Sequence, residues 1–269
     1  MSIILRKSYP SVVLAWLITF YAVLFSGFST ANNSSFESLH LATEDYAPMN
    51  YFEAGQFKGI SIDLLHEIWK LEGIGNTPEI LMYPWARAYK ELQQRDNFLL
   101  FAVARTPHRE NLFQWACPII KTRYILLGLH SANIQIGQAS DILRYRVGTI
   151  RADVSEQELI ENLPGAQRII VSNTSMRPNL DLLDKGRIQL IAYDELGAAT
   201  MLANAGRSIE DFKKAFTISQ SQTCFAFNKS TDGSTVKRFQ EHLKTLQKNG
   251  KYQEIVNRYY APSNADIQN

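Results

Sequence analysis

Short apolar segments alternate with amphipathic patterns along most of this 269-residue sequence, and this alternation restricts the possible folds more than any single motif does. Apolar segments that are bounded by turn residues and lack helical spacing are predicted strands. One of them, 98–103, is apolar throughout, as expected of a strand covered on both faces. The other predicted strands are 39–43, 80–82, 146–150 and 188–192. Strands that alternate with helices predict an α/β fold.

Helices are predicted between these strands, where apolar residues recur every three or four positions. The first spans 64–72, and a second begins after Pro84. Asp153 and Ser155 are alternative caps for a later helix, because each is followed three residues on by a glutamate. Asp194 begins another helix directly after a strand. These polar residues lie where strands end and helices begin.

The first residues have the pattern of a secretory signal peptide. Arg6 and Lys7 precede an apolar run at 12–25, and small residues lead up to Ala31. A membrane anchor is the alternative, but a spanning helix needs about 20 apolar residues. The sequence therefore predicts a cleaved signal peptide at 1–31 and a periplasmic mature protein.

Charge and cysteine content exclude several classes of function. Removal of residues 1–31 leaves 26 basic and 26 acidic residues, so the mature chain lacks the cationic field that nucleic acid requires. Cys117 and Cys224 lie far apart in the sequence and suggest no metal site. A disulfide between them and a pair of buried free thiols are both compatible with an exported chain. We expect no cofactor.

Two segments carry the chemistry of the chain. The run 46–70 combines an aromatic turn, a glycine-marked loop and an amphipathic helix. The run 104–110 places Arg109 at a predicted helix entrance, with Thr106 as N-cap and Pro107 as the first helical residue. These segments provide stacking surfaces and a fixed cation, and no nucleophile, metal cage or phosphate cradle. They favour a binding protein over an enzyme.

Six segments in a fixed order carry a resemblance to a known family. The chain resembles the family 3 periplasmic solute-binding proteins, the substrate-capturing subunits of polar amino-acid ABC importers. No single segment is decisive, but the ordered set is specific. The segments are YAPMNYFEAGQFKGISIDLL, PWARAY, ARTPHRENLFQW, YRVGTIRADV, LLDKGRIQLIAYDE and LQKNGKYQEIVNRY.

This resemblance implies a type II periplasmic binding protein fold, in which two α/β lobes are joined by two hinge strands and close on a ligand. The first lobe would be discontinuous. The implied division is a first lobe at 32–124 and 224–265, a second lobe at 125–223 and a tail at 266–269. The absence of a flexible linker suggests that strands near 123–129 and 223–227 cross between the lobes.

The resemblance also assigns roles to individual residues. Tyr46 falls where the family places an aromatic against the ligand, with core packing as the alternative. Arg109 falls at the arginine that grips the ligand's carboxylate, which a planar guanidinium does with two parallel hydrogen bonds. Asp194 falls where the ligand's ammonium group is received, although it is also a good helix cap. Arg151 and Asp153 precede a helix, whose free N–H groups bind anions.

The sequence departs from the family pattern next to these positions. Ala102, Ala104 and Arg105 stand where many amino-acid binders have hydroxyl residues, so a cation replaces hydrogen-bonding groups. Trp85 and Arg87 are added near the predicted cleft. The arginines expected there are Arg87, Arg105, Arg109 and Arg151. Together they predict a ligand more anionic than a zwitterion.

Two other functions are compatible with this resemblance. Periplasmic cyclohexadienyl dehydratases share the scaffold and need a positioned general acid, for which Glu44 and Asp194 are candidates. His66 and His108 lie on predicted helices and are expected to be exposed. A sensory role without transport is the second alternative. We expect a monomeric binding protein that is not an enzyme, with a small polar ligand and a membrane permease as its partners.

Overall fold

The computed structural model describes residues 36–75 and 78–259. The predicted signal peptide at 1–31 and the predicted tail at 266–269 therefore lie outside the described residues. Within the described part, no helix is long and apolar enough to cross a membrane.

An eight-stranded sheet runs through the described chain, and it contains both parallel and antiparallel pairs. We call β4, β1 and β5 the first half of the sheet and β9, β7 and β8 the second half; the strands within each half run parallel. The order across the sheet is β4 (Ile80–Met82), β1 (His40–Thr43), β5 (Phe98–Arg105), β10 (Phe212–Phe227), β6 (Gln114–Leu129), β9 (Leu190–Asp194), β7 (Val147–Ile150) and β8 (Ile170–Asn173).

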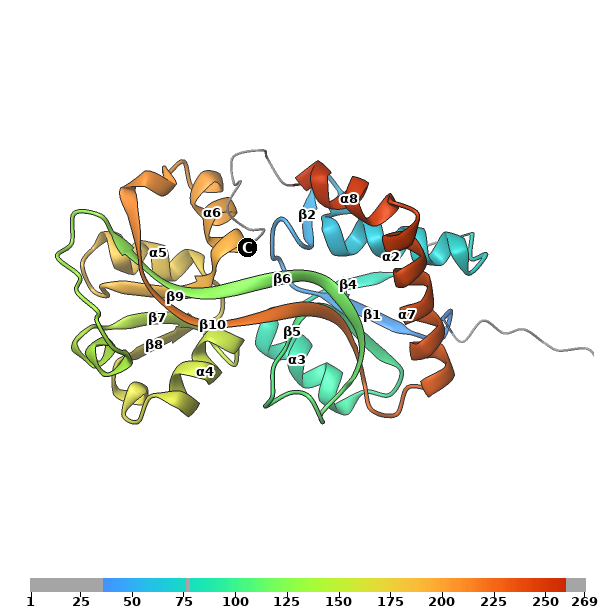
Figure 1. The fold of residues 1–269 in the computed structure, drawn as a ribbon, viewed down its shortest axis with the longest axis horizontal. Coiled ribbons are helices and arrows are strands. Elements are labelled where there is room, and N and C mark those ends of the chain that lie inside the picture. Colours follow the sequence, from blue (N-terminus) through green and yellow to red (C-terminus); the bar gives the residue numbers. More distant parts are fainter. Residues whose placement is uncertain (1–35, 76–77, 260–269) are drawn as a thin grey trace, which may run out of the picture. The chain divides into compact units, whose positions relative to one another are not determined.

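The two long strands β6 and β10 connect these halves (Figure 1). They pair with each other antiparallel along almost their whole length. β10 pairs with β5 through 222–227, whereas β6 pairs with β9 through 124–127. The chain therefore passes between the halves on two strands, near 121–123 and 220–222, a few residues away from the predicted crossings. The predicted lobe boundaries at 124–125 and 223–224 stay a prediction.

Helices follow most strands, as the sequence pattern predicts, but their bounds differ by a few residues. The short strand at 80–82 is confirmed, and Pro84 is the N-cap of the helix after it. The helices are α2 (Ile60–Leu71), α3 (Trp85–Gln94), α4 (Val154–Asn162), α5 (Arg177–Asp184), α6 (Glu195–Asn204), α7 (Gly233–Lys248) and α8 (Lys251–Tyr259). Short 3-10 helices η1 (Ala139–Arg144), η2 (Ala166–Arg168) and η3 (Ile209–Asp211) and the hairpin β2 (Tyr51–Glu53) to β3 (Gln56–Lys58) complete the described elements.

The predicted helix after Thr106 is wrong. Residues 107–112 form turns, and β6 begins at Gln114. The Arg109 amide donates to the Thr106 carbonyl at 3.0 Å and lies 3.3 Å from its hydroxyl, so a capped turn forms without a helix behind it. The segment is too short for helical turns, because β6 must start at Gln114 to pair with the end of β10.

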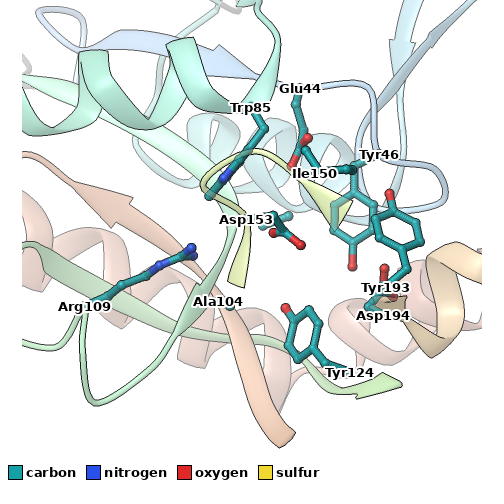
Figure 2. Close-up of a pocket in the computed structure, with 11 residues that line it drawn as sticks. Glu44, Tyr46, Trp85, Ala104, Arg109, Tyr124, Ile150, Asp153, Tyr193 and Asp194 are labelled. Carbon is teal, nitrogen blue, oxygen red and sulfur yellow. The ribbon is translucent and has the colours of Figure 1, made fainter. Parts of the chain in front are cut away.

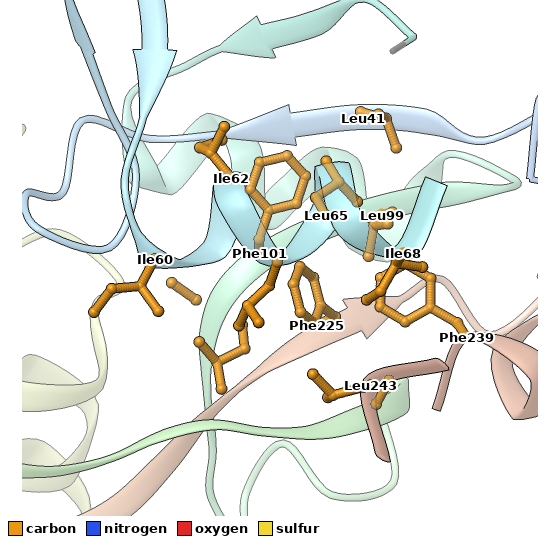
Figure 3. Packing of buried hydrophobic residues seen from close by; sticks show 14 of the residues in the cluster. Leu41, Ile60, Ile62, Leu65, Ile68, Leu99, Phe101, Phe225, Phe239 and Leu243 are labelled. Atoms are coloured by element: carbon orange, nitrogen blue, oxygen red, sulfur yellow. The ribbon is translucent and has the colours of Figure 1, made fainter. Parts of the chain in front are cut away.

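Apolar residues from distant segments form the core of the first half (Figure 3). Ile60, Leu65 and Ile68 on α2 meet strand residues of β1 and β5, and Phe239 on α7 packs against them from the C-terminal part of the chain. The Phe239 ring lies edge-on to Phe225, with 4.9 Å between ring centres. Aromatic contacts of this kind add about 0.5–1.5 kcal/mol to the burial energy. The first half is thus completed by residues after 224.

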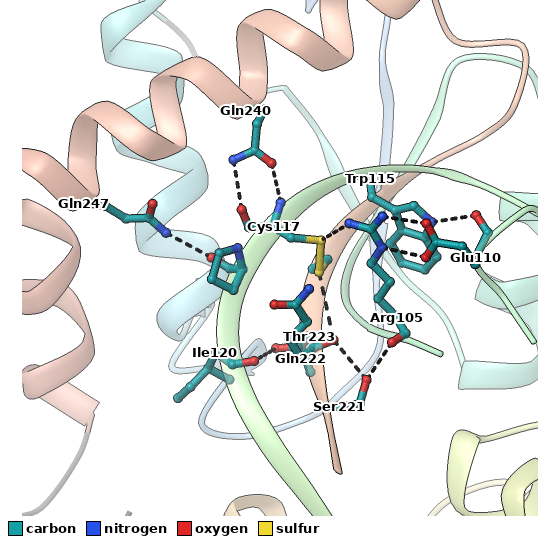
Figure 4. The surroundings of a disulfide bond; sticks show 12 residues. Arg105, Glu110, Trp115, Cys117, Ile120, Ser221, Gln222, Thr223, Gln240 and Gln247 are labelled. Atoms are coloured by element: carbon teal, nitrogen blue, oxygen red, sulfur yellow. Dashed lines mark hydrogen bonds and ion pairs between the residues drawn. A yellow bond between two sulfur atoms is a disulfide. The ribbon is translucent and has the colours of Figure 1, made fainter. Parts of the chain in front are cut away.

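Cys117 and Cys224 form a disulfide between β6 and β10 (Figure 4). The sequence left free thiols open as an alternative, and the pairing of these two strands decides between them. The bond closes a separation of 107 residues, and a loop of that length is worth about 4–5 kcal/mol in the chain-entropy account. Gln240 on α7 holds the same strand, because its side chain accepts from Cys117 N at 2.7 Å and donates to Cys117 O at 2.9 Å.

Candidate functional site

A pocket lies where the carboxyl ends of parallel strands from the two halves come together. Glu44 directly follows β1 and Ala104 lies near the end of β5, while Ile150 and Asp194 are the last residues of β7 and β9. Ligands of open α/β sheets bind outside the carboxyl ends of strands. The lining residues are Glu44, Tyr46, Trp85, Ala102, Ala104, Arg109, Tyr124, Ile150, Asp153, Tyr193 and Asp194 (Figure 2).

Arg109 provides a buried cation at one end of this pocket. Its side chain is fully buried, although it comes from a turn. The guanidinium contacts two aromatic rings, with its central carbon 5.2 Å from the Trp85 ring centre and 4.8 Å from that of Tyr89. Contacts of a guanidinium with a ring face are worth about 2 kcal/mol when desolvated. Trp85, on the first turn of α3, therefore forms part of the pocket wall; its contact with a ligand stays a prediction.

Residues of the second half supply the hydrogen bonds to Arg109. Gln157 Oε1 accepts from Nε at 3.0 Å and from Nη2 at 2.7 Å, and the Ala152 carbonyl lies 3.3 Å from Nη2. Nη1 is a buried donor without a hydrogen-bond partner among the described residues. The Trp85 indole N–H also donates to the Ala152 carbonyl, at 2.8 Å. The Ala152 carbonyl thus accepts hydrogen bonds from two side chains of the first half.

Ala152 has a strained backbone that aims this carbonyl. Its φ is +60°, in the left-handed region that residues other than glycine adopt rarely. The Ala152 amide donates to Glu156 Oε1 at 3.0 Å, so a side chain from the first turn of α4 stabilises this backbone conformation. Ala102, on the opposite wall, has φ +57°. Strained residues of this kind gather at functional sites and cost about 1–3 kcal/mol each.

Asp194 provides a buried carboxylate on the side of the pocket formed by β9 and α6. Its Oδ1 accepts from Gly197 N at 2.7 Å, so the predicted cap of α6 is confirmed. Its Oδ2 is buried without a hydrogen-bond partner in the described structure. Burial raises the pKa of Asp194 from 3.8 to about 7, although the hydrogen bond from the Gly197 amide opposes this shift. A buried oxygen without a donor is suited to receive a cationic group.

Acidic groups outnumber the single cation of the pocket. Burial, reinforced by the neighbouring Asp153 and Asp194 carboxylates, raises the pKa of Glu44, whereas Arg109 opposes the shift. Burial also raises the pKa of Asp153, again against the influence of Arg109. Asp153 caps α4 as predicted, accepting from Ser155 N at 3.4 Å, and Ser155 itself is not the cap. Three carboxyl groups therefore face one guanidinium.

Three tyrosines line the pocket in addition to Trp85 (Figure 2). Tyr46 lies in the turn after β1 and its ring centre is 6.1 Å from that of Tyr193. Tyr124 is the β6 residue that pairs with Asp194 across the ladder. Burial raises the pKa of all three hydroxyls, so they stay protonated and can donate hydrogen bonds. Tyr46, which the sequence predicts to contact a ligand, is thus one of three tyrosines whose hydroxyls line the pocket.

The structure does not bring the four predicted arginines together. Arg105 pairs with Glu110 through two hydrogen bonds of 2.7 and 2.6 Å, and this bidentate contact draws it away from the pocket. The Arg87 guanidinium stacks on Tyr83, 4.0 Å from the ring centre, on an exposed position of α3. Arg151 is exposed. Only Arg109 among these four lines the pocket, so the described structure does not form the cationic cluster that the sequence predicts.

Several lining residues were missed as ligand contacts by the sequence interpretation. Glu44 directly follows the end of β1, and Tyr193 is the residue before the end of β9. Tyr124 pairs with Asp194 across the ladder between β6 and β9. The rule that sites form at carboxyl ends of strands would have found Glu44 and Tyr193. Gln157 carries no such signal, because its position depends on how α4 meets the turn at Arg109.

Neither histidine considered for catalysis lines the pocket. His108 lies in the turn before Arg109 and pairs with Glu161 on α4 at 2.7 Å, with half of its side chain exposed. His66 lies on α2 and is half-buried. Among the described residues, no group of three His, Cys, Asp or Glu side chains is placed to hold a metal ion.

Comparison with known proteins identifies the class. The order of strands and the two connecting strands are those of a type II periplasmic binding protein fold, in which two α/β lobes are joined by two strands. Residues 39–262 match the family described as bacterial extracellular solute-binding proteins, family 3. The chain belongs to this family, which confirms the resemblance seen in the sequence. A search of curated proteins found no match.

Solved structures share the fold at low sequence identity. A histidine kinase sensor domain similar to periplasmic binding proteins has 16% identity and a TM-score of 0.73, over 83% of this chain and 96% of that one. A substrate-binding protein of an ABC uptake transporter from Streptococcus pneumoniae, with bound histidine, has 21% identity and a TM-score of 0.71, over 86% and 97%. An ancestral amino-acid-binding protein, a precursor of cyclohexadienyl dehydratase, has 21% identity and a TM-score of 0.68, over 83% and 95%.

Proposed function

We propose that this protein captures an amino acid in the periplasm for an ABC importer. The observation that carries the proposal is the pair of opposite charges in one pocket. The buried Nη1 of Arg109 and the buried Oδ2 of Asp194 both lack a hydrogen-bond partner in the part of the chain that the structure describes. An α-carboxylate fits the first group and an α-ammonium fits the second. The tyrosines between them supply stacking surface and hydroxyl donors.

The charge balance of the pocket favours a cationic or zwitterionic amino acid over a dicarboxylate. Glu44, Asp153 and Asp194 outnumber Arg109, and burial weakens the ionisation of all three acids. A second ammonium or a guanidinium on the ligand would stabilise a second carboxylate. This reverses the expectation from the arginines of the sequence, since Arg87, Arg105 and Arg151 lie outside the pocket.

Closure of the two halves would provide the capture step. Arg109 and Trp85 of the first half meet Ala152 and Gln157 of the second. A ligand that contacts both sides favours the closed arrangement, to the extent that it binds this arrangement more tightly than the open one. A membrane permease would then bind the closed form. We propose that the protein acts as a monomer.

A dehydratase activity is the second candidate, and Asp194 is the observation that favours it. A buried carboxyl group whose pKa is raised to about 7 can act as a general acid near neutral pH. One relative in structure is itself an amino-acid-binding precursor of such an enzyme. Incubation of the protein with prephenate or arogenate separates the two functions, because turnover indicates an enzyme and saturable binding without turnover indicates a receptor.

A thermal-shift screen of the mature protein tests the proposed function. The compounds are the protein amino acids, succinate and short peptides. We expect arginine, lysine or histidine to raise the melting temperature, because a ligand that binds only the folded state stabilises it by mass action. Glutamate and succinate should give smaller shifts. A larger shift with the dicarboxylates would overturn the proposed ligand class, and no shift with any amino acid would overturn the function.

A further inference from the structure

The acceptor that Arg109 meets is a side chain of the protein itself. Gln157 Oε1 lies 3.0 Å from Nε and 2.7 Å from Nη2, so one amide oxygen takes both donors along one edge of the guanidinium. The two donors of one edge are also those that a carboxylate binds in parallel. Gln157 therefore occupies one of the two guanidinium edges at which the carboxylate of a ligand can bind in parallel; the other edge includes Nη1, which has no hydrogen-bond partner among the described residues.

We propose that Gln157 is an intramolecular competitor for the ligand's carboxylate and thereby sets the affinity of the pocket. The inference rests on the proposed function, since it takes Arg109 as the group that binds the carboxylate. Arg109 can hold Gln157 or the carboxylate at this edge, and not both in full, because the edge offers only Nε–H and one Nη2–H.

The competing contact joins the two halves of the sheet. Arg109 precedes β6 and contacts Gln157, 48 residues further along the chain on α4. Three other contacts join the same surfaces: Trp85 and Arg109 donate to the Ala152 carbonyl, and His108 pairs with Glu161 on α4. The chain's own groups thus hold this side of the pocket closed.

The dimensions of the pocket require this contact to change when a ligand enters. The cavity has a volume of about 20 Å³, which is room for about one water molecule. An amino acid is several times larger than water. The halves must separate for entry, and separation breaks the bonds between Arg109 and Gln157. Molecules in which this contact holds the pocket closed cannot admit a ligand. The apparent affinity is therefore lower than the affinity of the open molecules, in proportion to the fraction that is open.

Two substitutions at one position test the competition with opposite expected signs. Gln157→Ala removes the competing oxygen, and Gln157→Glu replaces it with a carboxylate that pairs with Arg109 more strongly. We expect Gln157→Ala to bind amino acids on the order of tenfold more tightly and Gln157→Glu to bind them on the order of tenfold more weakly. Without ligand, the melting temperature should fall for Gln157→Ala and rise for Gln157→Glu.

Isothermal titration calorimetry with the protein amino acids measures these affinities on the full mature chain, and thermal melts without ligand give the stabilities. Gln94→Ala, at an exposed position of α3, is the control and should match the unsubstituted protein in both. The opposite movement of stability and affinity is the result that a merely structural glutamine would not give.

The outcomes separate this inference from the function beneath it. If the unsubstituted protein binds an amino acid and Gln157→Ala binds it equally or more weakly, Gln157 contacts the ligand or is indifferent, and the competition is overturned alone. If neither protein binds any amino acid, the proposed function fails as well. Binding by Gln157→Ala where the unsubstituted protein shows none would support the competition in its strongest form.

Discussion

The two charged ends of the pocket are held in different ways. Asp194 is fixed locally, because its Oδ1 accepts from Gly197 N only three residues away, at the start of the same helix. Arg109 depends on groups 43 and 48 residues further along the chain, at Ala152 and Gln157 of the other half of the sheet. Separation of the halves would leave the hydrogen bond between Asp194 and Gly197 intact and break those of Arg109 to Ala152 and Gln157. Arg109 is therefore the end whose partners change with closure, and Asp194 is the preformed end.

The largest effect on affinity is expected from Arg109→Ala. The substitution removes charge-assisted hydrogen bonds worth about 1.5–3 kcal/mol, which corresponds to roughly 10- to 100-fold weaker binding of an amino acid. Titration calorimetry measures the change. Arg105→Ala is the matched control, because Arg105 pairs with Glu110 outside the pocket and should bind as the unsubstituted protein does. Equal losses in the two variants would restore the arginine cluster that the sequence suggested.

The preformed end can be tested without disturbing its helix. Asn caps helices about as well as Asp, so Asp194→Asn should keep α6 and change the unfolding free energy by less than about 1 kcal/mol. It removes the charge that would receive an ammonium, and binding should weaken roughly tenfold. Asp232→Asn, at the cap of α7, is the control for the cap alone. A large loss of stability in Asp194→Asn with unchanged affinity would make Asp194 a structural cap only.

The pH dependence of binding follows from the raised pKa of Asp194. Its carboxyl binds a proton more tightly in the folded chain, at a pKa of about 7, than at its ordinary value of 3.8. Its contribution to stability without ligand is therefore greatest below pH 3.8 and is lost as pH rises to about 7.

Binding has the opposite sign, because an ammonium needs the ionised carboxylate. Affinity should fall about five- to tenfold for each pH unit below 7 and level off above it. Calorimetry from pH 5.5 to pH 8 tests this, and Asp194→Asn should flatten the profile. A profile that stays steep in Asp194→Asn would assign the dependence to Glu44 or Asp153.

The smallest effect is expected from Gly197→Ala. A Cβ at this position would lie 2.3 Å from Asp194 Oδ2, 2.8 Å from Tyr46 Cε2 and 2.9 Å from Tyr193 Cε1. Crowding should cost about 1 kcal/mol or more, partly offset by the better helix propensity of alanine, and should weaken ligand binding a few-fold. Gly75→Ala, with open space around the added carbon, is the control for thermal melts and titrations. Improved binding in Gly197→Ala would show that the pocket opens at Asp194 too.

Local rules were sufficient where a residue's partners are near it in the sequence. The alternation of apolar strands and amphipathic helices predicted the α/β fold, and the short strand at 80–82 is confirmed. Asp153 and Asp194 cap the helices that follow them, as the capping patterns predicted. At both caps, a hydrogen bond between residues two or three positions apart decides the local conformation.

Local rules failed where a distant partner decides. The turn at Thr106 has a helix-entrance pattern, yet β6 must begin at Gln114 to pair with β10, and no helix forms. The four arginines look alike in the sequence, but Glu110 pairs with Arg105 and Tyr83 stacks with Arg87. Only the surroundings of each side chain separate the buried cation from the surface ones.

The sequence by itself determined the family and the α/β architecture, because ordered motifs, periodicity and caps are local properties. Tertiary structure alone decided that Cys117 and Cys224 are bonded, that acids outnumber cations in the pocket and that Gln157 meets Arg109. These depend on contacts between segments tens of residues apart, and burial acts on a charge only after those segments have met.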